Sequence, residues 1–239
     1  MLDLRDRLIV ALDLPSAAEA RQIVSSLGDA VTTYKVGKQL FTAEGPGIVR
    51  DLVSSGRKVF LDLKFHDIPN TVAAAVRSAS DLGVSMLTVH ASGGSKMLRS
   101  AVEAASASQV RPLVLAVTVL TSLSDADLQE IGISGNVLSQ VLRLGALAQS
   151  AGCRGLVASA QEARELRREL GEGFEIVTPG VRPAGSSAGD QVRVLTPAEA
   201  IKAGATRLVV GRPIVGAQSP GEAAGQILNE IGQVLPVRA

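Results

Sequence analysis

The segment FLDLKFHDIPNT, residues 60–71, gathers groups that can do chemistry at the end of an apolar run. Asp62, Lys64 and Asp67 fall within six residues. Carboxylates beside a lysine favour its charged form, so we expect Lys64 to be an ammonium at neutral pH. An ammonium can donate a proton and stabilise a developing negative charge, whereas a Schiff-base nucleophile must be a neutral amine. The pattern therefore favours proton donation and argues against a Schiff-base aldolase.

The alternation of this segment predicts which side chains share a face. Successive side chains of a strand point to opposite faces. One face would hold Val59, Leu61 and Leu63, and the other would hold Phe60, Asp62 and Lys64. Asp62 and Lys64 would then lie about 6.6 Å apart along the strand. The alternative is an ion pair that only closes the end of a sheet, but buried pairs are weak stabilisers, and the crowding of charges favours a functional site.

Short runs rich in β-branched residues recur along the chain and predict the elements that position these groups. The runs span residues 8–13, 31–37, 58–64, 86–91, 113–120, 155–159, 175–180 and 207–212. Stretches of helical character separate them. Eight alternating strand and helix units close most simply into a (β/α)8 TIM barrel. An open doubly wound sheet is the competitor, but the glycine-rich turn often found after its first strand is absent here. We expect one catalytic barrel domain over residues 1–239.

Helix boundaries carry their own signals. Capping-box spacings are present at Ser16 with Glu19, at Thr196 with Glu199 and at Ser219 with Glu222. The last two pairs also have proline at the first helical position. Glycines stand where helices should end before the next strand, at Gly56, Gly83, Gly152 and Gly204.

The ends of the predicted strands carry most of the remaining candidates, because a barrel places its functional face at the carboxyl ends of its strands. These candidates are Asp13, Lys35, His90, Thr118, Thr121, Arg182, Gly211 and Arg212. Barrels commonly bind phosphate with the loops after strands seven and eight. Here these loops contain Arg182 and Gln191, and then Gly211 with Arg212, so a guanidinium and backbone N–H groups could bind one dianion. The glycine- and serine-rich residues 180–191 are expected to form a mobile lid, with an ordinary surface loop as the alternative.

Composition excludes several classes of function. The net charge is +1, aromatic residues make up 2%, and tryptophan is absent, so neither nucleic-acid binding nor membrane-surface binding is expected. The N-terminal segment lacks the apolar core of a signal peptide, and no apolar run is long enough to span a membrane. Cys153 is the only cysteine and is expected to be buried and inert. These features predict a cytoplasmic protein. His66 and His90 are expected to be structural residues.

Seven motifs together resemble the orotidine 5′-phosphate decarboxylase family in its bacterial stand-alone form. They are ALD at 11–13, YKVG at 34–37, DLKFHDIPNT at 62–71, TVLTS at 118–122, TPGVRPAG at 178–185, DQ at 190–191 and VGRPI at 210–214. They occur in the family's order and extend from the first predicted strand to the last. The resemblance implies conversion of orotidine 5′-monophosphate to UMP and CO2 in pyrimidine biosynthesis, without a metal or organic cofactor. It also implies a homodimer with shared active sites.

The resemblance further implies a role for each matching residue. Lys64 would protonate C6 of the pyrimidine, Asp62 would lie beside the substrate carboxylate, and Asp67 would come from the neighbouring subunit. The implied substrate-binding residues are Asp13, Lys35 and Thr71 near the ribose or in the charge array, Thr121 at the pyrimidine, Gln191 between phosphate and base, and Arg182, Gly211 and Arg212 at the phosphate.

Two alternatives are set against this interpretation. One is a Mg²⁺-dependent decarboxylase or aldolase that acts on sugar phosphates with the same barrel. Asp13, Asp62 and Asp67 could hold Mg²⁺ in principle. Such relatives need an acidic ligand where this chain has Lys35, and two lysines beside the carboxylates argue against a metal. The other alternative is a catalytically silent ligand sensor, which would be free to lose the charged residues that this chain retains.

Overall fold

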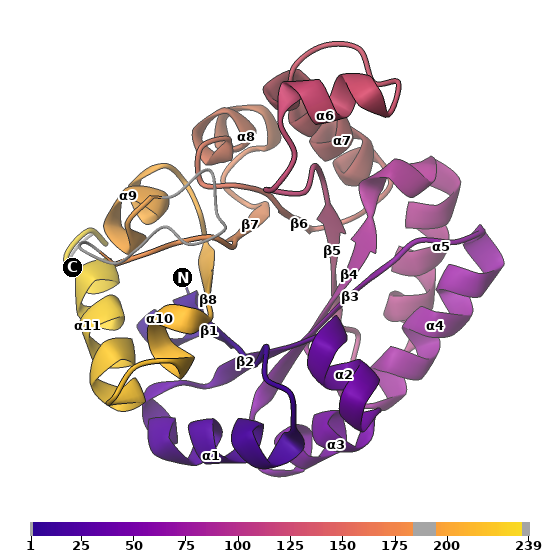
Figure 1. Cartoon of the computed structure of the whole chain (residues 1–239). Coiled ribbons are helices and arrows are strands. Elements are labelled where there is room, and N and C mark those ends of the chain that lie inside the picture. Colours follow the sequence, from indigo (N-terminus) through magenta and orange to yellow (C-terminus); the bar gives the residue numbers. More distant parts are fainter. Residues whose placement is uncertain (1, 184–194, 236–239) are drawn as a thin grey trace.

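The computed structural model describes residues 2–183 and 195–235. In these residues eight parallel strands pair in chain order, and β8 pairs back with β1 to close the sheet into a barrel. The strands are β1 (Leu8–Ala11), β2 (Thr33–Gly37), β3 (Lys58–Phe65), β4 (Met86–His90), β5 (Leu113–Val117), β6 (Gly155–Val157), β7 (Glu175–Thr178) and β8 (Arg207–Val210). Figure 1 shows the helices as a ring around the strands. The predicted (β/α)8 TIM barrel is confirmed.

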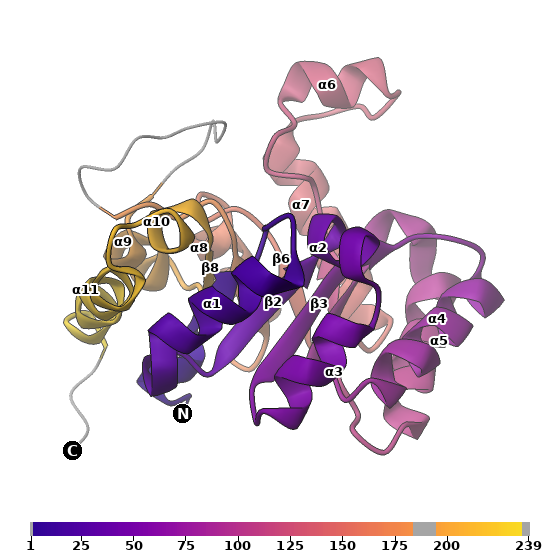
Figure 2. The same ribbon diagram turned by 60° about the horizontal axis from the view of Figure 1, so that its bottom comes forward.

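The helices alternate with the strands. They are α1 (Ala17–Leu27), α2 (Lys38–Glu44), α3 (Gly47–Ser54), α4 (Pro69–Asp81), α5 (Gly94–Ala107), α6 (Asp125–Glu130), α7 (Val137–Ser150), α8 (Ala163–Leu170), α9 (Pro197–Lys202), α10 (Arg212–Val215) and α11 (Pro220–Gly232). Short 3-10 turns are η1 (Leu4–Arg7), η2 (Gly28–Ala30) and η3 (Ala91–Gly93). Figure 2 shows α6 standing out from the barrel, on the side away from the N-terminus. Within the described ranges, no helix combines the length and apolar character that a membrane crossing needs.

Alternating side chains of the strands build two apolar layers. The layer inside the barrel consists of Ile9, Ala11, Phe60, Met86, Leu115, Val177 and Val209. The larger layer lies between the strands and the helices and includes Val59 and Leu61. Leu63 also packs against this larger layer, so the predicted alternation of side chains along β3 is confirmed.

Beyond Asp62 the pairing of β3 with β4 becomes irregular. Leu61 pairs with Leu87 and Phe65 pairs with Val89, so three residues of β3 lie opposite Thr88 alone. Within this bulge Lys64 has a φ of +53°, in the left-handed region that disfavours side chains with a Cβ. The carboxyl end of β3 thus departs from the regular pleat on which the predicted spacing of Asp62 and Lys64 rested.

Two of the three predicted N-terminal caps form. The Ser16 hydroxyl accepts a hydrogen bond from the Glu19 N–H, and Thr196 and Glu199 make a complete capping box. Ser219 makes no side-chain cap, so that prediction is wrong, although Pro220 does begin α11. The Ser219 backbone, at φ −127° and ψ 87°, is not in the extended conformation of the two successful caps. The predicted helix-ending glycines all adopt positive φ: Gly56, Gly83, Gly152 and Gly204.

Candidate active site

A cavity of about 510 Å³ opens at the carboxyl ends of the strands. Its polar lining comes from segments far apart in the sequence: Asp13, Lys35, Gln39, Asp62, Lys64, Thr121, Arg182 and Arg212. Its floor includes apolar side chains of the inner layer, among them Ala11, Phe60 and Val209. The barrel thus brings together eight of the eleven predicted site residues, the set above without Gln39 and with Gly211.

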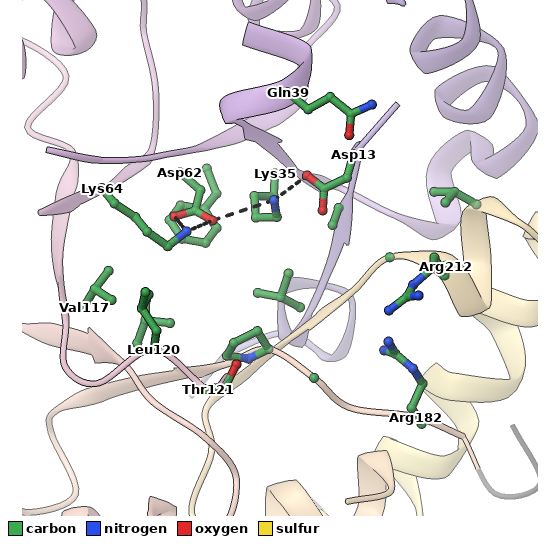
Figure 3. Close-up of a pocket in the computed structure, with 18 of the residues that line it drawn as sticks. Asp13, Lys35, Gln39, Asp62, Lys64, Val117, Leu120, Thr121, Arg182 and Arg212 are labelled. Carbon is green, nitrogen blue, oxygen red and sulfur yellow. Dashed lines mark hydrogen bonds and ion pairs between the residues drawn. The ribbon is translucent and has the colours of Figure 1, made fainter. Parts of the chain in front are cut away.

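On one side of the cavity, charges of alternating sign form a continuous chain (Figure 3). The Lys64 ammonium donates to both carboxylate oxygens of Asp62, at 2.9 and 2.8 Å. The Lys35 ammonium lies 3.7 Å from Asp62 Oδ2 and donates to Asp13 Oδ1 at 2.8 Å. We call these four residues the charge array. The side chains of Lys35 and Asp62 are only 10% and 13% exposed, so the centre of the array is largely shielded from water.

The array keeps Asp62 ionised. Burial alone would raise the pKa of this carboxyl, but attraction to Lys64 and Lys35, with hydrogen bonds from Lys64 and Thr88, outweighs burial and holds the pKa below its ordinary value. A carboxylate fixed in this way beside two ammonium groups does not act as a proton donor at neutral pH. Lys64, whose Nζ carries the transferable protons, is the candidate acid.

Gly37 leaves the space in which Asp13 and Lys35 meet. A Cβ at this position would lie 2.8 Å from Asp13 Oδ1 and 2.8 Å from Lys35 Nζ, closer than real Cβ contacts allow. Gly37 also pairs with Asp62 in the β2–β3 register. A side chain here would therefore push apart the Lys35–Asp13 ion pair at one end of the charge array.

The other side of the cavity holds two guanidinium groups. Figure 3 shows Arg182 and Arg212 pointing toward one another across the cavity from the charge array. Arg182 is 8% exposed, and its Nη1 donates to the Val181 carbonyl at 3.0 Å. Burial, and secondarily the neighbouring charge of Arg212, lowers the pKa of Arg182. Gly211 is the N-cap of α10 and Arg212 its first residue. Two converging guanidiniums beside a glycine backbone form a place for an anion such as phosphate.

Two predicted residues are not brought into the cavity, and a third lies outside the described residues. Asp67 is exposed, and its Oδ1 accepts a hydrogen bond from the N–H of the next residue, Ile68. Thr71 is also exposed, in the first turn of α4. Gln191, with residues 184–191 of the predicted lid, lies outside the described residues. The roles predicted for these three residues stay predictions.

Sequence reasoning missed two polar residues of this region. Gln39 lines the cavity from the start of α2, two residues after the YKVG motif. Thr88 is fully buried on β4 and hydrogen-bonds Asp62. The available signal for Thr88 was a hydroxyl residue at an inward position, two residues after Met86 and between the apolar Leu87 and Val89.

The residues predicted to be structural lie outside the cavity lining. The rings of His66 and His90 lie 5.3 Å apart between centroids and are tilted by 44°. Burial, with repulsion from His66, lowers the pKa of His90 to about 4. Cys153 is buried, and burial raises the pKa of its thiol to about 12, so the predicted inertness has a physical cause.

The fold and the cavity define a class, a (β/α)8-barrel protein whose strand ends form a charged site suited to an anionic ligand. Comparison with protein families identifies the member of this class. Residues 6–227 match the model of the orotidine 5′-phosphate decarboxylase / HUMPS family, and the chain belongs to that family.

Individual relatives agree with this assignment. The chain is 52% identical to orotidine 5′-phosphate decarboxylase of Idiomarina loihiensis over 227 residues, 95% of this chain and 98% of that protein. It is 53% identical to the decarboxylase of Halorhodospira halophila over 225 residues, 94% of this chain and 95% of that protein. Among solved structures, orotidine 5′-phosphate decarboxylase from Lactobacillus acidophilus matches with a TM-score of 0.84 at 39% identity, covering 95% of this chain and 99% of that one.

Proposed function

We propose that this chain converts orotidine 5′-monophosphate to UMP and CO2 by direct decarboxylation, without a metal or organic cofactor. The observation that carries the proposal is the cavity itself, in which a lysine ammonium held by a carboxylate faces a pair of guanidiniums. The prediction of a carboxy-lyase is confirmed at the level of the family, because the curated relatives are named as decarboxylases. The phosphate of a nucleoside monophosphate is an anion that Arg182 and Arg212 could bind on their side of the cavity.

Lys64 is the proposed proton donor. When the bond between C6 and the carboxylate breaks, its electron pair stays on C6 and CO2 leaves. The Lys64 ammonium lies where this charge develops, so it lowers the barrier electrostatically and then transfers one Nζ proton to C6. Asp62 holds the ammonium in place and lies beside the departing carboxylate. Because Asp62 is itself ionised, it cannot compete with Lys64 as the donor.

The remaining predicted residues bind the rest of the substrate in this proposal. Arg182, Gly211 and Arg212 bind the phosphate, with Gln191 between phosphate and base. Asp13, Lys35 and Thr71 act at the ribose or complete the array, and Thr121 contacts the pyrimidine. Phosphate binding touches no reacting bond, but its energy can be used in the transition state. Residues 180–191 are the proposed lid of a single catalytic domain.

A second copy of the chain completes the site in this proposal. Asp67 is exposed and hydrogen-bonds only its neighbour Ile68 among the contacts found in the described residues, and Ile68 is 67% exposed. An apolar side chain in that position suits burial against another chain. We propose a homodimer in which Asp67 reaches the partner's cavity, and a cytoplasmic location for the enzyme.

Lys35 favours this function over the Mg²⁺-dependent alternative. Its ammonium donates to Asp13 and lies near Asp62. The two carboxylates that a metal ion would need are therefore already paired with Lys35. A divalent cation at the same place would be repelled by Lys35 and Lys64.

The test is turnover of orotidine 5′-monophosphate by the purified full chain in EDTA, followed as UMP formation. We expect metal-independent turnover that is lost in Lys64→Ala. Absence of turnover in EDTA, together with activity on a sugar phosphate after Mg²⁺ is added, would assign the chain to the alternative.

A further inference from the structure

Thr88 connects the two central residues of the charge array through one hydroxyl. Its Oγ1 accepts a hydrogen bond from the Lys64 backbone N–H at 2.9 Å and donates one to Asp62 Oδ1 at 3.0 Å. Thr88 has no exposed surface, and its place on β4 follows the inward-facing Met86 by two residues. The hydroxyl therefore bonds the main chain of one residue of the array and the side chain of another.

The bulge in β3 explains why this hydroxyl is needed. Residues 62–64 lie opposite Thr88 alone, so the regular ladder is interrupted there, and the Lys64 N–H donates to the Thr88 hydroxyl oxygen. Lys64 also has positive φ, shared among described non-glycine residues only with Arg111. Such a conformation persists only when its surroundings hold it in place. The Thr88 oxygen supplies an acceptor inside the barrel.

The same contact fixes the carboxylate that holds the Lys64 ammonium. Asp62 Oδ1 accepts hydrogen bonds from Lys64 Nζ, at 2.9 Å, and from the Thr88 hydroxyl. Thr88 thus sets where the backbone of Lys64 lies and where the partner of its ammonium lies. A group that holds both ends of a catalytic side chain determines its aim without touching the substrate.

We propose that Thr88 is a positioning residue of the active site, whose hydroxyl locks the β3 bulge so that Lys64 and Asp62 keep their reactive arrangement. The catalytic part of this inference rests on the proposed decarboxylase function. Thr88 acts through Asp62 and Lys64, so its loss should lower the rate of the chemical step more than it weakens substrate binding.

The test compares Thr88→Val, which keeps the shape but removes the hydroxyl, with Thr88→Ser, which keeps the hydroxyl. In Thr88→Val we expect kcat to fall by at least about tenfold and KM to change by less than about threefold. Loss of the hydrogen bond also raises the pKa of Asp62, so the acid limb of the kcat/KM profile should move to higher pH. Thr88→Ser should recover kcat to within about threefold of the wild type.

A second readout is independent of turnover. Amide hydrogen exchange at Lys64, measured by NMR, should be slow in the wild type and in Thr88→Ser and at least about tenfold faster in Thr88→Val. Circular dichroism melts check that each variant is folded under the assay conditions. If the wild type does not turn over orotidine 5′-monophosphate, the proposed function fails while exchange still decides the positioning role. Unchanged exchange in Thr88→Val, kcat within about twofold of an active wild type, or equal losses in both variants would overturn the inference.

Discussion

Strand β3 carries a lysine at each end, each lysine pairs with an aspartate, and the two pairs differ in their exposure and in their neighbours. At the amino end, Lys58 donates to Asp6 at 2.6 Å, and the Lys58 side chain is 51% exposed. At the carboxyl end, Lys64 bonds Asp62, which is in turn close to Lys35 in the charge array. The first pair has an exposed lysine and lies away from the cavity, whereas the second pair is largely buried, linked to Lys35 and open to the cavity.

The difference teaches how to separate structural from functional ion pairs. An exposed pair such as Lys58 with Asp6 contributes at most about 1 kcal/mol to stability. A linked array in a partly buried site costs desolvation energy that the pairing recovers only in part. Strand β8 repeats the contrast. Arg207 at its amino end donates to the Asp6 carbonyl and forms an ion pair with Glu175, while Arg212 just beyond its carboxyl end lines the cavity. In both strands, the end at the cavity is where function is expected.

The largest effect should come from the two lysines of β3. In Lys64→Ala, kcat/KM for orotidine 5′-monophosphate should fall by at least about a thousandfold, because both charge stabilisation and proton donation are lost. Lys58→Ala should keep near-wild-type kcat/KM and lose only about 1 kcal/mol or less of stability. Steady-state kinetics and urea unfolding of both variants check this. Equal activity losses at both lysines would erase the distinction between the two ends.

The arginines at the two ends of β8, Arg207 within the strand and Arg212 just beyond it, should give the next largest effect. Arg212→Ala should lower kcat/KM by at least about a hundredfold, roughly 2.7 kcal/mol, because the phosphate loses a guanidinium. Arg207→Ala should leave kcat/KM nearly unchanged and lower the free energy of unfolding by about 1 kcal/mol. A loss below tenfold for Arg212→Ala in steady-state assays would reject its role at the phosphate.

Substitutions at two glycines, Gly37 and Gly47, should give the smallest effect on kcat/KM. Gly37→Ala places a Cβ against Asp13 and Lys35, so we expect kcat/KM to fall about tenfold as the array is pushed apart. Gly47→Ala is the control, because its added Cβ has nothing within 4 Å and it lies at the start of α3. Steady-state kinetics and thermal melts of the two variants check whether the loss of activity is specific to Gly37→Ala. Wild-type kinetics in Gly37→Ala would show that the array tolerates the displacement.

The sequence predicted the parts of this site that follow from the barrel rule. Asp13, Lys35, Asp62 and Arg212 could be placed together because parallel strands bring their carboxyl ends to one face. Strand ends were predicted less well. The apolar pattern suggested a strand over 113–120, but β5 ends at Val117, since the side-chain pattern does not record where backbone pairing stops.

Other features depend on contacts that no local pattern contains. Thr88 reads as an ordinary strand residue until the bulge in β3 brings Asp62 and Lys64 to it. The space that Gly37 leaves becomes visible only when the side chains of Asp13 and Lys35 converge on it. The contacts of Thr88 and Gly37 follow from the tertiary structure. The predicted role of Asp67 also needs a second chain, which a single sequence does not place.

Because the barrel closes between β1 and β8, the sheet can be completed only late in synthesis of the chain. Leu8 pairs with Leu208, so the last strand to leave the ribosome completes the sheet begun by the first. The charge array comes entirely from the segment between Asp13 and Lys64, whereas both guanidiniums of the cavity follow residue 181. A nascent chain thus contains the proposed acid, Lys64, long before it contains the two arginines proposed to bind the phosphate. Catalytic competence should appear abruptly, with translation of the final strand and the slow, non-local pairing that shuts the barrel.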